Sequence, residues 1–416
     1  MTQSYSKLFT AFGRIGVYSF GGPAAQIALM HRELVEREGW LEEEDFLGAL
    51  SFCMLLPGPE AMQLATYAGW RLKGVPGGLI AGLLFVLPGA VAMFAISAIY
   101  AIWRTVPLVE GAFLGIQCAV VAIVMEALFK VSRKALKAPD RWVIAALSFL
   151  AIFAFSVPFP VIIALAALWG FLFAHATKND RVEEKLTSRA IWPVVIFSAL
   201  WIVPIVALWA SNSNFLWSVA TFFSKLAVVT FGGAYAVLAY MAQEVVAEFG
   251  WISTAQMMDG LALAESTPGP LILVTQFVGF QAGYAAGGMG LAFLAGLLTL
   301  WVTFVPCFLW IFAGAPFLSR LTASPRISAA LSAITAAVVG VILNLSVWFA
   351  VNVLFQDVGN LDVGPLSILT VELNSVDWIA AGLTGLGIVS LLWARLGLGV
   401  TLLVGAAAGL TLSLAF

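Results

Sequence analysis

A Pro-Gly-Pro motif occurs twice inside long apolar stretches of this chain, at residues 57–59 and 268–270. The copies lie 211 positions apart, and at the same offset the Phe-Gly-Gly motif at 20–22 recurs at 231–233. Proline cannot donate a backbone hydrogen bond and glycine tolerates left-handed backbone, so both motifs interrupt a helix. Because self-similarity at a fixed spacing indicates a repeated structural unit, we expect two copies of one helix-breaking element.

Composition places these breaks inside a membrane. Of 416 residues, 62% are hydrophobic and only 10% are charged, whereas soluble domains carry about 25% charged residues. The sequence therefore predicts an all-α, polytopic protein of the lipid bilayer. No basic tail or soluble domain is long enough to bind nucleic acid. Backbone freed at membrane depth is tolerated where it lines a cavity, which is how many transporters build a binding site.

The apolar stretches divide into about thirteen membrane segments of the length that a bilayer requires. The domain organisation we expect is a first repeat at 1–175, a basic cytoplasmic loop plus linking helix at 176–214, and a second repeat at 215–416. The first two segments of each repeat are irregular, so broken or re-entrant helices are expected at the FGG and PGP motifs. The predicted segments are 8–30, 46–70, 76–102, 108–129, 142–157, 158–175, 191–210, 215–242, 256–281, 286–313, 327–354, 377–394 and 396–415.

Loop charges predict the orientation. Lysine and arginine collect on the cytoplasmic side, and the richest basic loops, 130–141 and 178–189, are separated by two segments. This places the N-terminus in the cytoplasm and the C-terminus in the periplasm. Loop 130–141 holds five basic residues, whereas its equivalent, 355–377, holds four acids and no lysine or arginine. The reversed bias predicts two repeats of inverted topology.

Each copy also carries a cation six residues before the FGG motif, Arg14 in the first and Lys225 in the second. A cation within hydrocarbon normally faces a cavity, a partner or the interface. Simple alternatives exist for each feature: snorkelling of the cations, close helix packing on the glycines and a plain proline kink.

Taken together, the motifs predict a site for a small anion with several acceptor oxygens. Helices that restart at the prolines would aim free N–H groups and positive dipole ends at the breaks. Hydroxyls could add donors, with Ser266 and Thr267 as further candidates. The predicted substrate-binding residues are Arg14, Ser19, Gly21, Gly22, Pro23, Pro57, Gly58, Pro59, Lys225, Thr230, Gly232, Gly233, Pro268, Gly269 and Pro270.

Acidic residues near the motifs are asymmetric. Glu60 follows the first PGP motif where the second has Leu271, and Glu265 precedes the second where the first has Met54. A carboxyl beside an anion site must be neutralised, paired or part of a proton relay, so both glutamates are candidates for proton coupling. For Glu60 the alternative is a dipole-favoured position in the first turn of a helix.

Catalytic and metal chemistry are not indicated. The three cysteines, Cys53, Cys118 and Cys307, stand singly in apolar runs, and neither histidine lies near one in sequence. We expect buried thiols, no cofactor and no metal. A membrane enzyme is disfavoured because the apolar segments hold no cluster of acids for a metal.

With FGGP at 20–23, Gly-Trp at 39–40 after a charged connector, and the duplicated FGG and PGP motifs, the chain resembles the chromate ion transporter (CHR) family in its long-chain, two-domain bacterial form. The second copy departs from the first: it has Ala234 in place of Pro23 and Lys225 in place of Arg14.

The resemblance implies a secondary transporter that exports chromate across the inner membrane and confers chromate resistance, with sulfate as a related oxyanion. Uptake or exchange of sulfate or another oxyanion, and a passive anion channel, remain alternatives. The oligomeric state, a homodimer included, is left open.

Overall fold

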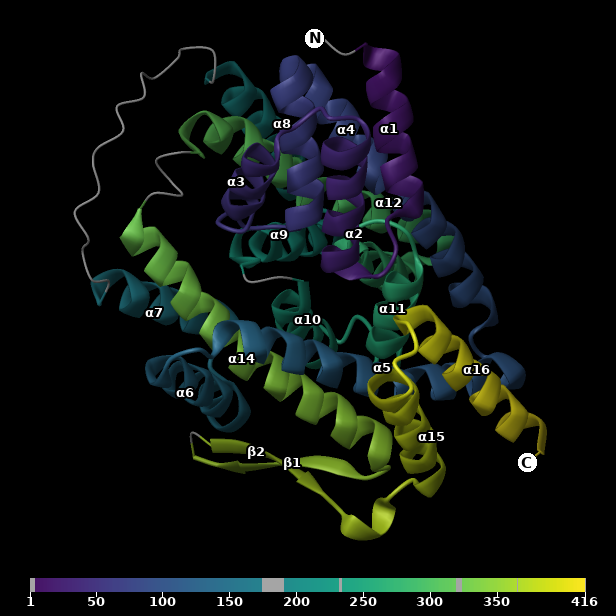
Figure 1. Ribbon diagram of the computed structural model, residues 1–416. Coiled ribbons are helices and arrows are strands. Elements are labelled where there is room, and N and C mark those ends of the chain that lie inside the picture. Colours follow the sequence, from purple (N-terminus) through teal and green to yellow (C-terminus); the bar gives the residue numbers. More distant parts are fainter. Residues whose placement is uncertain (1–3, 174–190, 232–233, 319–323, 365, 416) are drawn as a thin grey trace. The chain divides into compact units, whose positions relative to one another are not determined.

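The computed structural model describes residues 4–173, 191–231, 234–318, 324–364 and 366–415 (Figure 1). They form two compact units, each assembled from three stretches of chain. Unit 1 comprises 1–98, 175–234 and 267–328, and unit 2 comprises 99–174, 235–266 and 329–416. The extents of the expected repeats remain a prediction.

Six helices among the described residues are long and apolar enough to cross a membrane, which confirms a polytopic, α-helical membrane protein. The count of thirteen segments stays a prediction. The six candidate spans are Glu60–Trp103, Pro107–Ala135, Ile191–Ala210, Leu271–Phe317, Pro325–Leu354 and Leu398–Ala415.

Helices break at both kinds of motif. The FGG motif at 20–22 separates α1 (Tyr5–Tyr18) from α2 (Gly22–His31), and the PGP motif at 57–59 separates α3 (Glu43–Cys53) from α4 (Glu60–Trp103). In the second half, α9 (Asn214–Val229), α10 (Ala234–Ala242), α11 (Thr254–Ser266) and α12 (Val274–Gly314) follow the same order. Helices of 9 to 13 residues, such as α2, α3, α10 and α11, are too short to cross about 30 Å of hydrocarbon.

The long helices α4 and α12 are both helical hairpins. Non-helical backbone at Lys73 and Gly74 divides α4, and Gly287 with Gly288 divides α12. The arms of α4 approach so closely that a Cβ on Gly69 would lie 2.3 Å from the carbonyl oxygen of Gly77. Glycine turns therefore join two pairs of consecutive predicted segments, 46–70 with 76–102 and 256–281 with 286–313.

Local geometry recurs at the offset seen in the sequence. A π-helical turn, η1 (Arg32–Arg37), follows α2, and a second, η3 (Gln243–Glu248), follows α10 at an offset of 211 residues. The glycine after each turn, Gly39 or Gly250, has a φ of 60°. These shared details follow from the duplicated charged connectors.

Unit 1 also contains α8 (Ile191–Ala210) and the short helices η4 (Leu271–Leu273) and η5 (Ala315–Phe317). Its helices approach closely at glycine. A Cβ on Gly16 of α1 would lie 2.0 Å from the carbonyl oxygen of Leu84 in α4. Amide side chains of α12 also reach α4, where Gln276 Nε2 donates to the carbonyl oxygen of Ala90 at 2.9 Å.

Unit 2 contains α5 (Pro107–Ala135), α6 (Pro139–Phe155), α7 (Phe159–Leu172) and most of α14 (Pro325–Leu354). It also contains α10, η3 and α11, and the helices α15 (Trp378–Ile388), η7 (Val389–Trp393) and α16 (Leu398–Ala415). Small residues let α5 and α16 pack backbone to backbone, since a Cβ on Gly115 would lie 1.9 Å from the Gly405 carbonyl oxygen. Such contacts are typical of helices that associate in lipid.

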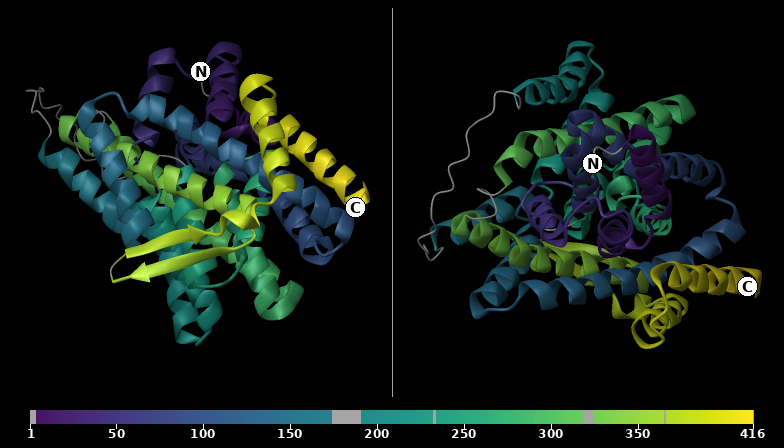
Figure 2. Two further views of the ribbon diagram at one scale, coloured as in Figure 1. Left: turned by 90° about the horizontal axis from the view of Figure 1, so that it is seen from below. Right: turned by 45° about the horizontal axis from the view of Figure 1, so that its top comes forward.

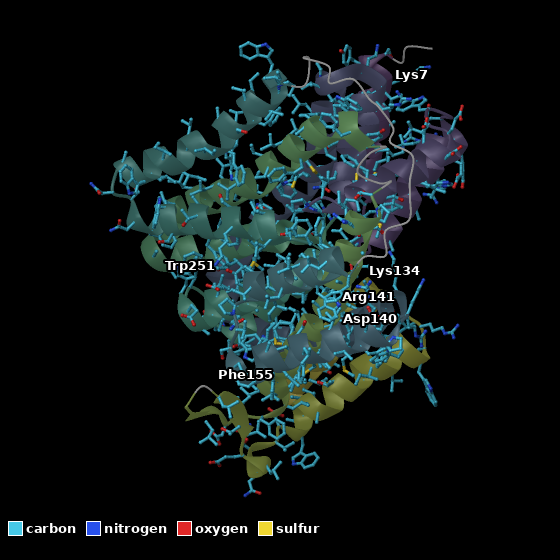
Figure 3. The ribbon with its side chains drawn as sticks, turned by 90° about the vertical axis from the view of Figure 1, so that its left-hand side faces the viewer. Lys7, Lys134, Asp140, Arg141, Phe155 and Trp251 are labelled. Atoms are coloured by element: carbon cyan, nitrogen blue, oxygen red, sulfur yellow. The ribbon has the colours of Figure 1, made fainter. Side chains whose placement is uncertain are left out.

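The predicted loops of unit 2 differ in form. Residues 355–377 contain an antiparallel hairpin, β1 (Val358–Val363) with β2 (Leu366–Val371), which the sequence analysis took as an acidic loop (Figure 2). The strand β2 packs on α6, a short η6 (Leu373–Ser375) follows, and Asp377 caps α15 by accepting from two backbone N–H groups at 2.9 Å. Lys134 lies in the last turn of α5, and Asp140 and Arg141 lie in the first turn of α6 (Figure 3).

Candidate functional site

The two PGP motifs are held by crossed hydrogen bonds in unit 1. The N–H of Gly58 donates to the carbonyl oxygen of Thr230, and the N–H of Gly269 donates to that of Ser19, each at 2.9 Å. Each acceptor directly precedes an FGG motif, so the PGP motif of one half is bound to the FGG segment of the other. Both glycines have left-handed backbone, with φ of 118° and 92°, which only glycine adopts readily.

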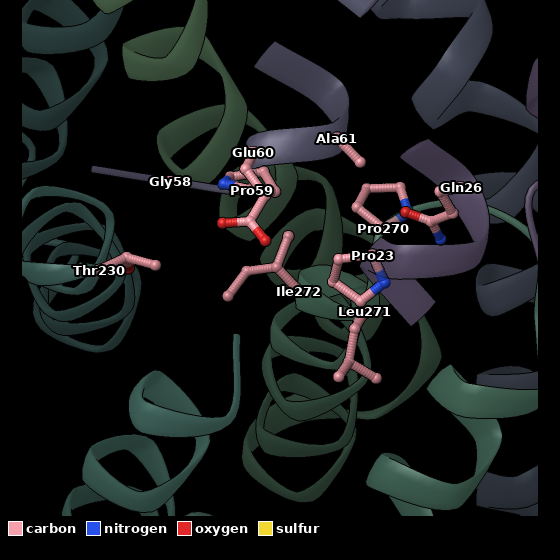
Figure 4. Close-up of a pocket in the computed structure, with 10 residues that line it drawn as sticks. All are labelled: Pro23, Gln26, Gly58, Pro59, Glu60, Ala61, Thr230, Pro270, Leu271 and Ile272. Atoms are coloured by element: carbon pink, nitrogen blue, oxygen red, sulfur yellow. The ribbon is translucent and has the colours of Figure 1, made fainter. Parts of the chain in front are cut away.

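A small cavity of about 20 Å³ lies at this crossing (Figure 4). Three helices begin on its wall: α2 with Pro23, α4 with Glu60, and η4 after Pro270. The first turn of a helix has unsatisfied N–H groups and a positive dipole end, which together favour a bound anion. The cavity is lined by Pro23, Gln26, Gly58, Pro59, Glu60, Ala61, Thr230, Pro270, Leu271 and Ile272.

Two amides that the sequence analysis missed fix the breaks. Gln26, which is buried, donates from Nε2 to the carbonyl oxygen of Gly269 at 2.7 Å and to that of Ser19 at 3.3 Å. Gln63, also buried, donates to the carbonyl oxygen of Pro57 at 2.6 Å. Glutamine near a proline break carries no distinctive pattern, so the available signal was a buried polar residue on an apolar helix.

Glu60 brings a negative charge to the same wall. Its carboxylate extends from the first residue of α4 into the region between Gly58 and Ile272 (Figure 4). An anion and an ionised Glu60 would repel each other across this cavity. Glu60 therefore lines the cavity, and its role in proton coupling stays a prediction.

Arg14 pairs with Glu33 and lies outside the cavity wall. Its Nη1 is 3.4 Å from Oε2 of Glu33, and Arg37 approaches the same oxygen at 3.3 Å. The side chain of Glu33 is buried, so two arginines neutralise one desolvated carboxylate. A separate groove between α1 and α2 of about 680 Å³ is lined by Arg14, Tyr18, Phe20, Ala25, Ala28, Leu29, Arg32 and Glu33.

The equivalent cation of the second half, Lys225, is exposed on α9 and also lies outside the cavity wall. Neither cation lines the cavity at the crossing, whereas Arg14 shares its groove with Phe20 of the first FGG motif, and a role of both cations in substrate binding stays a prediction. Gly232 and Gly233 lie outside the described residues. Gly21 and Gly22, in contrast, have φ of 85° and 77°, as a helix break on glycine requires.

The predicted hydroxyl donors are engaged within their own helices. Ser19 Oγ donates to the carbonyl oxygen of Ile15 at 2.6 Å, and the hydroxyl of Thr230 donates to that of Leu226. Ser266 likewise donates to the carbonyl oxygen of Leu263 at 2.9 Å. Because a hydroxyl has one hydrogen, these three side chains offer an anion no donor in this conformation.

Glu265 belongs to unit 2 and is buried. One carboxylate oxygen accepts from the hydroxyl of Tyr235, and the other, Oε2, is buried with no hydrogen-bond partner among the described residues. The three cysteines are buried, and the described residues hold no cluster of three or more metal-ligating side chains.

The sequence matches a known family over two long stretches. The family model for chromate transporters matches residues 6–171 and 217–410. The chain belongs to the chromate transporter family. The match falls on two stretches, and each contains one FGG and one PGP motif.

Several transport proteins are similar to this chain in sequence. The chain is 34% identical over 344 residues to the chromate transport protein of Pseudomonas aeruginosa, covering 82% of this chain and 80% of that one. It is 29% identical over 359 residues to a probable chromate transport protein of Synechococcus elongatus, covering 82% and 83%. An uncharacterized transporter of Bacillus subtilis is 32% identical over 169 residues, which are 40% of this chain and 94% of its own. No solved structure matches this chromate transporter family member.

Proposed function

We propose that this protein is a secondary transporter that exports chromate across the cytoplasmic membrane and so confers chromate resistance. The observation that carries the proposal is the cavity on which three helix N-termini open between crossed breaks. Backbone N–H groups at helix starts suit a tetrahedral dianion because they supply several donors without adding a basic side chain. The names of the relatives support chromate as the substrate.

The cavity requires opening before the substrate binds. Its 20 Å³ accommodates about one water molecule, whereas a tetrahedral oxyanion has four oxygens of that size. Transport by alternating access moves one part of a transporter against another around a central site. The described conformation therefore corresponds to a closed site, and substrate entry must separate residues such as Glu60 and Ile272.

Proton coupling at Glu60 follows from charge. A dianion entering beside an ionised carboxylate is disfavoured, and a proton on Glu60 removes the repulsion. Glu60 would thus bind a proton when the substrate binds and release it when the substrate leaves. Glu265 is a second candidate for proton binding, because its buried Oε2 has no hydrogen-bond partner among the described residues.

The decisive test is transport of radiolabelled chromate into proteoliposomes under an imposed pH gradient. We expect uptake that saturates, follows the gradient and is inhibited by sulfate, and we expect Glu60→Gln to transport without dependence on the gradient. Empty vesicles are the control. Wild-type vesicles that take up chromate no faster than empty ones would overturn the proposal.

The alternatives predict different results in the same assay. Faster transport of sulfate than of chromate favours uptake or exchange of sulfate. Flux that rises linearly with concentration and ignores the gradient favours a passive channel.

Inverted repeats and the orientation of the termini form part of the proposal and have their own test. The native cysteines are buried, so a single introduced cysteine can be labelled selectively. Leu373 is exposed in the loop predicted to be periplasmic, and Lys134 lies at the end of α5, in the segment 130–141 predicted to be cytoplasmic. A membrane-impermeant maleimide should label Leu373→Cys in intact cells and Lys134→Cys only after permeabilisation. The reverse pattern contradicts the orientation.

A further inference from the structure

A second buried carboxyl group lies on α11 in unit 2. Asp259 is 2% exposed. The hydroxyl of Tyr100 donates to its Oδ2 at 2.6 Å, and Nε2 of Gln117 donates to its Oδ1 at 2.9 Å. Gln117 belongs to α5, one of the helices able to cross the membrane. Neither donor carries a charge.

The charge of Asp259 is therefore poorly compensated. None of the ion pairs formed by the described residues includes Asp259. The cation that acts on it is Arg104, whose guanidinium lies 5.7 Å from the centre of the Tyr100 ring. Glu33, by comparison, contacts two arginines. Burying an unpaired carboxylate is costly, so a group in this position readily takes up a proton.

The other ionisable groups on α11 and on the helices that pack on it do not neutralise the charge of Asp259. Helices α5 and α16 pack on α11, and α16 contains no ionisable residue. On α5, Glu110 is exposed, whereas Glu126 forms an ion pair with Lys130 at 2.8 Å. Glu265, six residues further along α11, accepts a hydrogen bond from the hydroxyl of Tyr235.

The hydrogen bonds accommodate both protonation states. The amide of Gln117 can donate to Oδ1 whether or not Asp259 carries a proton. The hydroxyl of Tyr100 donates to a carboxylate and, by rotating, accepts from a carboxylic acid. Gaining a proton thus changes the charge of the cluster by one unit without dismantling it.

The carboxyl is also absent from the equivalent position of the first half. The residue 211 positions before Asp259 is Gly48 on α3, and a Cβ on Gly48 would meet no atom within 4 Å. The short helix before a PGP break therefore forms without a carboxyl at this position, so the acid in the second half has a role other than building that helix.

We propose that Asp259 is a proton-binding site of the transport cycle, with Tyr100 and Gln117 as its positioning residues. A proton binds to the carboxylate from water on one side, travels as the neutral acid and returns to water on the other. The proposal extends the proton coupling of the proposed function to a second acid in unit 2.

The first test uses the reconstituted full-length protein and separates exchange from coupled accumulation. Exchange of labelled for unlabelled chromate needs no gradient, whereas accumulation does. We expect Asp259→Asn to retain exchange and lose accumulation driven by a pH gradient. Asp357→Asn, the same change at an exposed residue of unit 2, should retain both. Wild-type accumulation in Asp259→Asn overturns the proposal, as does accumulation that follows a sodium gradient instead of the pH gradient.

The second test does not depend on transport. Infrared difference spectra of the purified protein between high and low pH should contain the C=O band of a buried carboxylic acid. The part of this band that belongs to Asp259 should vanish in Asp259→Asn and persist in Glu265→Gln. In Tyr100→Phe, which preserves the ring, the same band should appear with a different pH midpoint. An unchanged spectrum in Asp259→Asn overturns the site. If wild-type vesicles exchange no chromate, the proposed function fails and the infrared result alone decides the proton site.

Discussion

The two PGP breaks share a backbone geometry and differ in chemistry. The break at 57–59 is half-buried at both prolines and is followed by Glu60. The break at 268–270 is buried at Gly269 and Pro270 and is followed by Leu271, which is also buried. The two breaks thus share the left-handed glycine and the crossed hydrogen bond, and the first alone has an ionisable residue directly after the motif.

The two breaks also differ in what holds them. A Cβ on Gly58 would meet side chains, Nε2 of Gln63 at 2.8 Å and Sγ of Cys307 at 2.9 Å. At the second break, a Cβ on Gly269 would meet Cδ1 of Leu273 at 3.1 Å and the backbone Cα of Gly89 at 3.5 Å, and a Cβ on Gly89 would come within 2.0 Å of the Pro268 carbonyl oxygen. Side chains can rotate away and backbone cannot, so we infer that the first break moves more easily than the second.

The largest effect should come from a side chain between Gly89 and the second break. Gly89→Ala forces the Pro268 carbonyl to move and should destabilise the protein by about 3 kcal/mol. Thermal unfolding of the purified protein in detergent measures the loss. Gly13→Ala, at a helical position with no atom within 4 Å of the new Cβ, should be neutral or stabilising. Equal unfolding temperatures for the two variants would show that the second break is not locked by backbone.

The cations of the two halves should respond unequally. Arg14→Ala leaves buried Glu33 with Arg37 alone, and we expect a loss of about 2 kcal/mol, less than for a fully broken buried pair. Lys225→Ala, on an exposed side chain, should change stability little. The same unfolding measurement tests both. Arg14→Ala combined with Glu33→Gln should recover most of the loss, and failure to recover would assign Arg14 a role beyond neutralising Glu33.

Removing the amide that binds the second break should have a smaller effect. Gln26→Leu leaves the carbonyl oxygen of Gly269 without this donor, at a cost of about 1 kcal/mol. The residue at the equivalent position of the second half is Val237, so a leucine should be tolerated sterically. Chromate exchange in proteoliposomes should slow more in Gln26→Leu than in Gln63→Leu if the second break must stay fixed. A greater slowing in Gln63→Leu would show that the first break, and not the second, must stay fixed during transport.

The smallest effect should come from the histidine at the end of α2. Nε2 of His31 lies 2.5 Å from Oε2 of Glu43, and Nδ1 of His31 lies 3.2 Å from Oε1 of Glu36. The hydrogen bond to Glu43 raises the pKa of His31 above its usual 6.5. Its stabilising contribution is therefore complete below about pH 6.5 and is lost as the pH rises through the higher pKa of the folded state. We expect His31→Ala to lower stability at acidic pH by less than about 1 kcal/mol. A loss that grows at alkaline pH contradicts the assignment.

The sequence predicted where helices break because proline and glycine act locally. It could not predict that the N–H of Gly58 donates to Thr230, or that the N–H of Gly269 donates to Ser19. A repeat in the sequence shows that two segments are alike, but it does not show which segments contact each other in the fold. Arg14 was recognised, yet the sequence did not reveal that it forms an ion pair with Glu33 away from the cavity. Gln26 was missed because its two acceptors are backbone carbonyls, which leave no residue pattern.

The crossed hydrogen bonds have a consequence for how the chain is made. Ser19 emerges from the ribosome about 250 residues before Gly269, the residue whose N–H it accepts. Contacts between residues so distant in sequence form late and slowly. Until the second half has been inserted, the early FGG segment must therefore wait in the membrane without the N–H of Gly269, and Gln26 at 3.3 Å is the donor that the first half supplies to the Ser19 carbonyl. Truncation before residue 268 should leave that segment open to quality-control proteases, however well its own helices have formed.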